Sequence, residues 1–179
     1  MSRFLKSLRA ALFAVTCLMA DVVMAVVNGP DIDPLDDMEL VGKARMQVLF
    51  WDVYDAQLYA PGGIWNDGDP FALSLTYLRS LQGVKIAERS IAEIRKQGFS
   101  DERTLARWYE NLIAIIPDVA NSDEIIGVAD DNAHTQFYLD GRFIGEIREP
   151  AFTRAFFAIW LGAKSSEPRF RDRLLGVRS

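Results

Sequence analysis

The period of the hydrophobic pattern changes from that of a strand to that of a helix near residue 79, and this change limits which folds are available. Residues 71–78 alternate between two sets of side chains, which is typical of a β-strand. Residues 80–97 instead place apolar side chains every three to four positions, as an amphipathic helix does. The alternating set is Phe71, Leu73, Leu75 and Tyr77, and the helical set is Val84, Ala87, Ile91 and Ile94. The chain must therefore combine sheet and helix in its core.

The remaining elements follow from the same patterns. They are a strand pair within 38–59, short strands at 124–129, 135–139 and 142–147, and helices at 100–116, 151–161 and 168–175. Asp140-Gly141 is typical of a two-residue hairpin turn, and Ser100 is the expected N-cap of the second helix. Strands, two helices, a three-strand meander and further helices indicate an α+β fold, with a mostly antiparallel sheet and helices on one side.

The first 25 residues resemble a secretory signal peptide. Three basic residues precede an apolar run at 10–18, and Val23-Met24-Ala25 supplies the small residues of a cleavage site. We expect cleavage after Ala25, with Ala20 as the lesser site. The sequence therefore predicts a periplasmic or secreted protein of the bacterial envelope, with no stable membrane anchor after cleavage.

A cleaved signal has two alternatives. A membrane anchor is disfavoured because a span needs about 20 apolar residues, whereas this run is short and Asp21 interrupts it. A lipoprotein signal would lipidate Cys17, but Thr16 stands where such sites carry Gly, Ala or Ser. Cleavage leaves an extended lead-in at 26–37 and one domain at 38–179, long enough for a real core. Cys17 is the sole cysteine, so the mature chain needs no disulfide.

The composition excludes several classes of function. The net charge is −5 and no basic cluster is present, so nucleic acid is a poor candidate partner. Glycine-rich phosphate loops and the common hydrolase and metalloprotease motifs are missing from the sequence. His134 is the only histidine, so a multi-histidine metal site is excluded and the sequence offers no argument for a Ser-His-Asp triad. We therefore expect no metal and no cofactor, and we interpret His134 as a surface residue.

Arg45 is the first candidate for a binding residue. It lies in an otherwise apolar strand region, near Tyr54 and Tyr59. An arginine that faces a cavity is costly unless it meets an anion, and a carboxylate supported by a tyrosine hydroxyl would satisfy it. The alternative is a solvent-facing arginine paired with Asp52 or Glu39, and exposure is the commoner state of arginine.

Two further features have a structural and a functional interpretation. Arg79 lies between a strand and a helix, where a cap or a surface ion pair is its expected role. The aromatic stripe of 151–161 could line a ligand pocket, although stripes at helical spacing more often form core.

Several segments in order resemble the chalcone isomerase superfamily, and in particular its secreted bacterial chalcone isomerase-like members. The strand Val53–Tyr59 resembles the family's V-Y-x-x-x-L-Y strand, and Tyr77-Leu78-Arg79 resembles its next landmark. The tail segments 137–145, 156–162 and 166–176 extend the resemblance over about 38–176. It implies an open-faced β-sandwich: a large, mostly antiparallel sheet with a helical layer packed on one face. Ligands of the superfamily lie between the two layers.

The resemblance also implies roles for particular residues. Plant members close a chalcone ring and related members bind fatty acids, and both use an arginine upstream of the V-Y strand, which Arg45 matches. Tyr54 falls near a catalytic threonine of the isomerases. Phe99 and Ala106 stand near the positions of their later tyrosine and asparagine. The proton-positioning groups of the isomerase are therefore missing from this alignment.

Three functions remain open from the sequence. The first is a non-catalytic binding protein for a small apolar acid of fatty-acid type, with Arg45, Tyr54 and Tyr59 as ligand-binding residues. The second is a chalcone isomerase-type intramolecular lyase, with Arg45 and Tyr54 as catalytic residues. The third is an envelope interaction protein without a ligand. The sequence determines neither the ligand nor the oligomeric state.

Overall fold

The computed structural model describes residues 33–177, so the predicted signal peptide and most of the lead-in lie outside it. Within these residues, a six-stranded antiparallel sheet forms the frame, and its strands lie in chain order. The strands are β1 (Glu39–Val48), β2 (Trp51–Ala60), β3 (Phe71–Tyr77), β4 (Glu124–Ala129), β5 (Thr135–Leu139) and β6 (Arg142–Ile147). A short 3₁₀ turn, η1 (Pro61–Gly63), follows β2.

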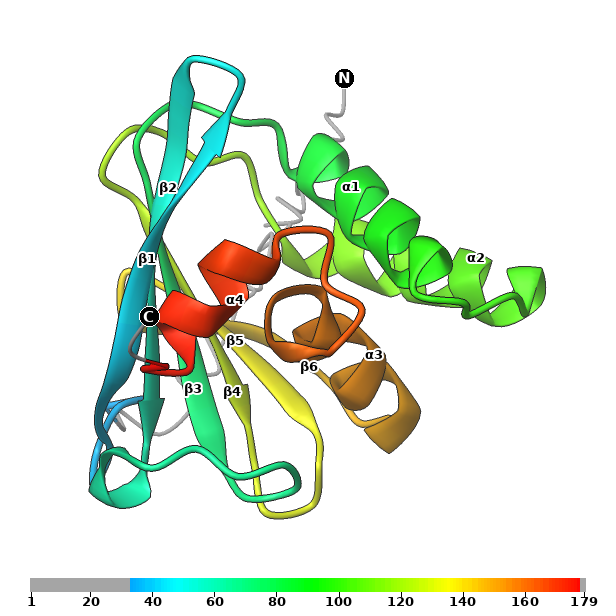
Figure 1. Cartoon of the computed structure of the whole chain (residues 1–179). Helices are drawn as coiled ribbons and strands as arrows, with labels where there is room; N and C mark the ends of the chain where they lie inside the picture. The colour runs from blue at the N-terminus through cyan, green and yellow to red at the C-terminus, as the bar shows by residue number, and fades with distance from the viewer. Residues whose placement is uncertain (1–32, 178–179) are drawn as a thin grey trace, which may run out of the picture.

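The four helices of the described chain cover one face of this sheet (Figure 1). They are α1 (Gly83–Lys96), α2 (Glu102–Ile115), α3 (Pro150–Leu161) and α4 (Pro168–Leu174). Helices α1 and α2 pack against each other and connect β3 to β4 along the chain, and α4 packs against β1. The α+β class and the open-faced arrangement predicted from the sequence are confirmed. Among residues 33–177 we find no helix that meets the length and hydropathy needed to span a bilayer.

Alternation along the strands decides which side chains meet the helices. In β2, Ala56, Leu58 and Ala60 are buried on the helix side, whereas the residues between them are only partly covered. Two glycines permit close approach, Gly83 between the start of α1 and the end of α2, and Gly127 between the sheet and α3. A Cβ at Gly83 would lie 2.2 Å from the backbone oxygen of Ile116, and a Cβ at Gly127 would lie 3.3 Å from the ring of Phe157.

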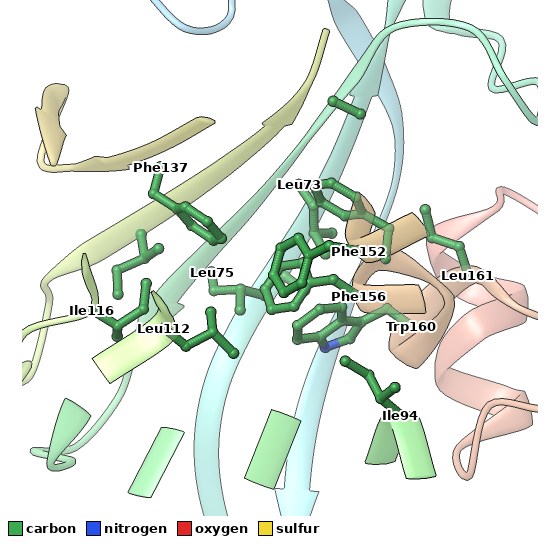
Figure 2. Close-up of a cluster of buried hydrophobic side chains, with 14 of the residues drawn as sticks. Leu73, Leu75, Ile94, Leu112, Ile116, Phe137, Phe152, Phe156, Trp160 and Leu161 are labelled. Atoms are coloured by element: carbon green, nitrogen blue, oxygen red, sulfur yellow. The ribbon is translucent and has the colours of Figure 1, made fainter. Parts of the chain in front are cut away.

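An aromatic cluster from α3 forms the centre of the core. Phe152, Phe156 and Trp160 point from α3 toward the sheet, as Figure 2 shows. The rings of Phe152 and Phe156 stack at 5.2 Å, and Phe137 of β5 meets Phe156 edge-on at 5.5 Å. The stripe is thus core, as the more common case predicts, and two of its rings, Phe156 and Trp160, also line a cavity between the layers.

The opposite face of the sheet carries a small apolar cluster. Ala72, Ile126, Val128 and Tyr138 are buried there. The chain before β1 covers them: residues 34–37 form turns, and Leu35 and Met38 pack on the cluster. The described end of the lead-in is therefore turned rather than extended.

Element boundaries agree with the sequence patterns to within a few residues, and the clearest difference is one cap. The N-cap of α2 is Asp101, not Ser100, and its carboxylate accepts hydrogen bonds from the amides of Arg103 and Thr104. Gly98 has a φ of 105°, which turns the chain after α1 and leaves Ser100 one position too early to reach these amides.

Candidate ligand-binding cavity

A cavity of about 420 Å³ lies between the sheet and the helices. This volume falls within the range of small-molecule sites, roughly 300–1,000 Å³. Its walls come from β1, β2, β3, β4 and β5 on one side and from all four helices and their connections on the other. The inner lining is apolar and buried, and consists of Leu75, Leu112, Ile116, Ile125, Phe137, Phe156, Trp160 and Phe170. Figure 2 shows several of these side chains facing one another across the two layers.

The outer part of the cavity is polar and opens to solvent. Three cations line it: Arg79 from the β3–α1 connection, and Lys85 and Arg89 from α1. All three are exposed, so they mark the mouth rather than the floor. The cavity therefore has an apolar interior and a cationic rim, which is the layout that suits an amphipathic anion.

Each cation at the mouth has a different set of partners. Lys85 pairs with Glu88 at 2.7 Å. Arg89 pairs with Glu93 at 2.6 Å, and Glu93 also contacts Lys96 at 2.9 Å. Arg79 stacks over the Trp51 ring at 5.2 Å and has no carboxylate partner among the residues described.

Glu93 is a buried carboxylate of the cavity wall, and its surroundings keep it ionised. Burial acts to raise the pKa of Glu93, but hydrogen bonds from Ser166 and Lys96 and the charge of Arg89 hold that pKa below its ordinary value. With two cations around one carboxylate, this part of the rim keeps a net positive charge. Glu167, on the α4 side of the mouth, offsets it in part.

Two tyrosines on neighbouring strands supply hydroxyl groups to the cavity. Tyr54 of β2 and Tyr77 of β3 are register partners, and their rings meet edge-on at 6.0 Å. The Tyr54 hydroxyl accepts a hydrogen bond of 2.9 Å from the indole N–H of Trp160. Within 33–177, the hydroxyl protons of Tyr54 and Tyr77 have no acceptor. Both can thus donate to a ligand.

Burial keeps these two hydroxyl groups protonated. It raises the pKa of Tyr54 to about 12, with the Trp160 hydrogen bond opposing the shift. Burial raises the pKa of Tyr77 further still. At neutral pH the pair therefore acts as hydrogen-bond donors, not as bases.

Comparison with known families decides what kind of protein this is. The model of the chalcone isomerase-like family matches residues 34–176. The chain belongs to the chalcone isomerase-like family. No curated protein sequence matches it significantly.

Among solved structures, this chalcone isomerase-like chain is similar to a fatty-acid binding protein of Arabidopsis thaliana. The sequence identity is 15% and the TM-score is 0.60, and the match covers 79% of this chain and 88% of that one. At this identity the likeness establishes a shared fold.

Arg45 does not reach the cavity, so its interpretation as an inward-facing residue is wrong. It is the register partner of Asp55 on the face away from the helices. Its guanidinium binds Asp55 at 2.7 Å and Asp52 at 3.1 Å, with about half of its side chain exposed. The alternative interpretation, a solvent-facing arginine paired with Asp52, is the one observed. The physical reason is that two carboxylates and water solvate this charge better than an apolar cavity would.

Tyr59 lies outside the cavity too. It is five positions from Tyr54 along one strand, and an odd separation places two side chains on opposite faces. Its ring packs on the small outer cluster, and its hydroxyl donates to Gln57. Of the three predicted binding residues, only Tyr54 lines the cavity. The binding role assigned to Tyr54 stays a prediction.

The remaining predicted positions are placed as follows. Phe99 packs on Trp108 at a ring distance of 4.7 Å, Ala106 is exposed, and neither lines the cavity. The helices that contact Tyr54 are α3, through Trp160, and α4, through Phe170, and α1 lines the same cavity with Ile86, Arg89, Ser90 and Glu93. His134 is half-buried in the β4–β5 turn, away from the cavity. Among residues 33–177, we find no cluster of His, Cys, Asp and Glu that could hold a metal ion.

Sequence reasoning missed the three cations of the mouth. The expected roles of Arg79 were a helix cap or an ion pair, but Asp118 accepts from the amide of Gly83 at the start of α1. Lys85 and Arg89 have the pattern of ordinary charges on a solvated helix face. One signal was available: a four-residue spacing places both on the same side of α1.

Proposed function

We propose that this protein binds a small apolar acid of fatty-acid type and does not transform it. The observation that carries the proposal is the cavity itself, which joins a buried apolar interior to a mouth with three cations. A ligand with one anionic end and one apolar end matches both parts. The fatty-acid binding protein that shares this fold supports the same class of ligand.

The charge distribution favours one orientation of the ligand. An ionised carboxylate deep in the cavity would meet only the hydroxyls of Tyr54 and Tyr77, and that leaves most of its desolvation cost uncompensated. At the mouth the carboxylate can bind Arg89, because the ion pair with Glu93 occupies only one of the five N–H donors of that arginine. The carboxylate therefore lies at the cationic rim, and the tail extends toward Leu112 and Phe137.

The groups that line the cavity support binding better than catalysis. Tyr54 and Tyr77 are held protonated, and Glu93 is engaged by Arg89, Lys96 and Ser166. None of the three is poised to take a proton near neutral pH. Ring closure of a chalcone remains the alternative activity, and a measurement of chalcone turnover by absorbance tests it. A rate above the spontaneous reaction would replace the binding proposal with the enzymatic one.

The central experiment asks what the protein holds. The full chain is produced with its own leader, purified without detergent and examined by native mass spectrometry. We expect a bound aliphatic acid, and we expect titration of delipidated protein with a long-chain fatty acid to restore it. Protein that carries no lipid and shows no affinity for fatty acids would refute the proposal.

A matched pair of variants tests the role of the mouth. Arg89→Gln should weaken binding of a fatty acid about 3- to 10-fold, a partial loss because the site is exposed to solvent. It should leave binding of the corresponding fatty alcohol unchanged. Arg107→Gln is the control, since Arg107 is also an exposed helical arginine paired with a glutamate, Glu149 at 2.8 Å, but lies outside the cavity lining. Equal effects of the two variants would remove Arg89 from the site.

The cellular location forms part of the proposal. The signal-like pattern of residues 1–25 supports export to the periplasm or the medium. Fractionation of cells, with N-terminal sequencing of the recovered protein, should give a chain that starts at Val26. An intact N-terminus in the cytoplasmic fraction would contradict it.

A further inference from the structure

The tip of the β1–β2 hairpin exposes a run of large apolar side chains. Val48, Leu49, Phe50 and Trp51 follow one another at the turn, where Leu49 has a φ of 57°. Leu49 is 87% exposed and Phe50 is 97% exposed, and Val48 and Trp51 are more than half exposed. Figure 1 shows this hairpin reaching one end of the molecule. These side chains are mostly not covered by other residues of the 33–177 region. Exposed apolar clusters of this kind are typical of interaction sites.

The tip is continuous with the mouth of the cavity. Val48 belongs to both, since its side chain also lines the cavity. Trp51 contacts Arg79 of the rim through a cation–π interaction at 5.2 Å. On the other side of the mouth, Val84 of α1 is a further exposed apolar residue, next to Lys85. A surface that receives the tip would therefore also lie against the opening.

The charges around the tip are divided between the two faces of the hairpin. Arg79 has no acidic partner among the residues described, and the cluster of Arg89, Glu93 and Lys96 keeps one positive charge. Of the carboxylates that line the mouth in the described chain, Glu167 is the one outside an ion pair. The mouth is thus weakly positive, whereas Arg45, Asp52 and Asp55 on the outer face of the same hairpin together carry one net negative charge. The region around the tip is therefore close to neutral, and its apolar side chains, not its net charge, favour a lipid surface. Tryptophan beside arginine is the combination that favours the headgroup region of a membrane.

The size of the patch argues against a protein partner. A stable protein interface uses roughly 20–30 residues on each side, whereas the tip offers four consecutive residues on a narrow hairpin. A lipid surface needs no matching shape, and its binding strength grows with the apolar area that is inserted.

We infer that the hairpin tip, residues 48–51, inserts into the headgroup region of a lipid bilayer and holds the mouth of the cavity against the membrane surface. This inference deepens the proposed function and rests on it, because a lipid-like ligand could then pass between bilayer and cavity without crossing water. The attachment is reversible, since a few inserted side chains anchor far less strongly than a spanning helix.

The test uses the protein as recovered from cells, with vesicles of phosphatidylcholine and added phosphatidylglycerol. Sedimentation should recover the wild-type protein with the vesicles. Brominated lipids should quench the fluorescence of Trp51, since Trp108 and Trp160 are buried and Trp65 lies beyond the far end of β2. Phe50→Ser should reduce vesicle binding by about tenfold or more, the partition expected of one inserted aromatic side chain. Because Phe50 is almost fully exposed, the variant should fold normally.

Ile64→Ser is the matched control. Ile64 is 69% exposed and follows β2 at the strand's opposite end, so it tests exposed apolar area away from the tip. The control should bind vesicles like the wild type, and both variants should bind a soluble short-chain fatty acid unchanged. A wild type that ignores vesicles, or equal losses in the two variants, would overturn the inference.

Two further outcomes distinguish membrane docking from self-association and from the proposed function. Dimerisation lost in Phe50→Ser, without vesicle binding by the wild type, would identify the tip as a contact between copies and overturn membrane docking. Vesicle binding through the tip by a protein with no affinity for fatty acids would refute the proposed function and leave the docking surface standing.

Discussion

The two faces of the β1–β2 hairpin place neighbouring residues in different environments, one in solvent and one in the cavity. On the outer face, Arg45 and Asp55 are register partners and bind each other in solvent. One position away, Met46 and Tyr54 are also register partners, but both line the cavity. The outer pair is complete within the chain, whereas the inner pair presents an apolar surface and a hydroxyl donor to whatever fills the cavity.

This contrast shows that a charge in a strand is poor evidence of a binding site. An arginine with carboxylates across the strand has its partners already and contributes little beyond local order. The informative groups are those left without a partner where a ligand can replace water. Among the residues described, the hydroxyl protons of Tyr54 and Tyr77 meet that description inside the cavity, and the guanidinium of Arg79, which has no carboxylate partner, meets it at the mouth. Substitutions on the two faces should therefore have different effects.

The largest effect is expected from the inner core. Phe152 is fully buried between the sheet and α2, and its ring contacts Trp108 and Phe156. Phe152→Ala should lower the free energy of unfolding by about 3–5 kcal/mol, measured by urea denaturation. Phe143→Ala is the control, since Phe143 is 43% exposed on β6. A similar loss in both variants would mean that the two environments do not differ in packing.

The second effect compares a tyrosine of each face. Tyr54→Phe removes the acceptor of the Trp160 indole N–H, and an unpaired donor at this site should cost about 1–3 kcal/mol of unfolding free energy. Fatty-acid affinity should change less in this variant than in Arg89→Gln, because the proposed orientation places the carboxylate at the rim and not at this hydroxyl. Tyr59→Phe should change neither quantity appreciably, because its hydroxyl is bonded to Gln57 on the outer face. Weaker binding in Tyr59→Phe alone would restore the predicted binding role of Tyr59.

The third effect is a dependence of stability on alkaline pH. Because the pKa of Tyr54 is raised from 10 in the unfolded chain to about 12 in the folded protein, the unfolded state loses this proton first. Its stabilising contribution is complete below pH 10 and declines between pH 10 and 12, by about 1.4 kcal/mol per pH unit. The decline of stability across this range should be shallower in Tyr54→Phe by that slope, as measured by denaturation curves. An unchanged slope would show that Tyr54 is not buried as described.

The smallest effect is expected at Arg45, the first binding residue that the sequence suggested. Arg45→Gln should leave fatty-acid affinity unchanged, because the guanidinium lies on the face opposite the cavity. Isothermal titration beside Arg89→Gln gives the comparison directly. A selective loss in Arg45→Gln would contradict the placement of the ligand on the inner face.

Much of the fold could be predicted because each helix and strand shows its own hydrophobic periodicity in the local sequence. The spans of β4, β5 and β6 match the predicted ones, and the alternation of residues 71–78 matches β3. The odd spacing of Tyr54 and Tyr59 along one strand is itself enough to place them on opposite faces. The predicted N-cap of α2 is one residue too early, since the position of this cap depends on how Gly98 turns the chain.

The sequence by itself determined the elements, their order, the fold class and the positions that share a face of each strand. Only the tertiary structure decided which face the helices cover, and with it that Arg45 lies in solvent while Arg79, Lys85 and Arg89 surround one opening. The physical reason is that hydrophobic periodicity reports which residues share a face of one helix or strand, and not which other element packs on that face. The cavity arises where β1, β2, β3, α1 and α3 meet, and residues 46, 54, 77, 89 and 160 come together there through packing alone.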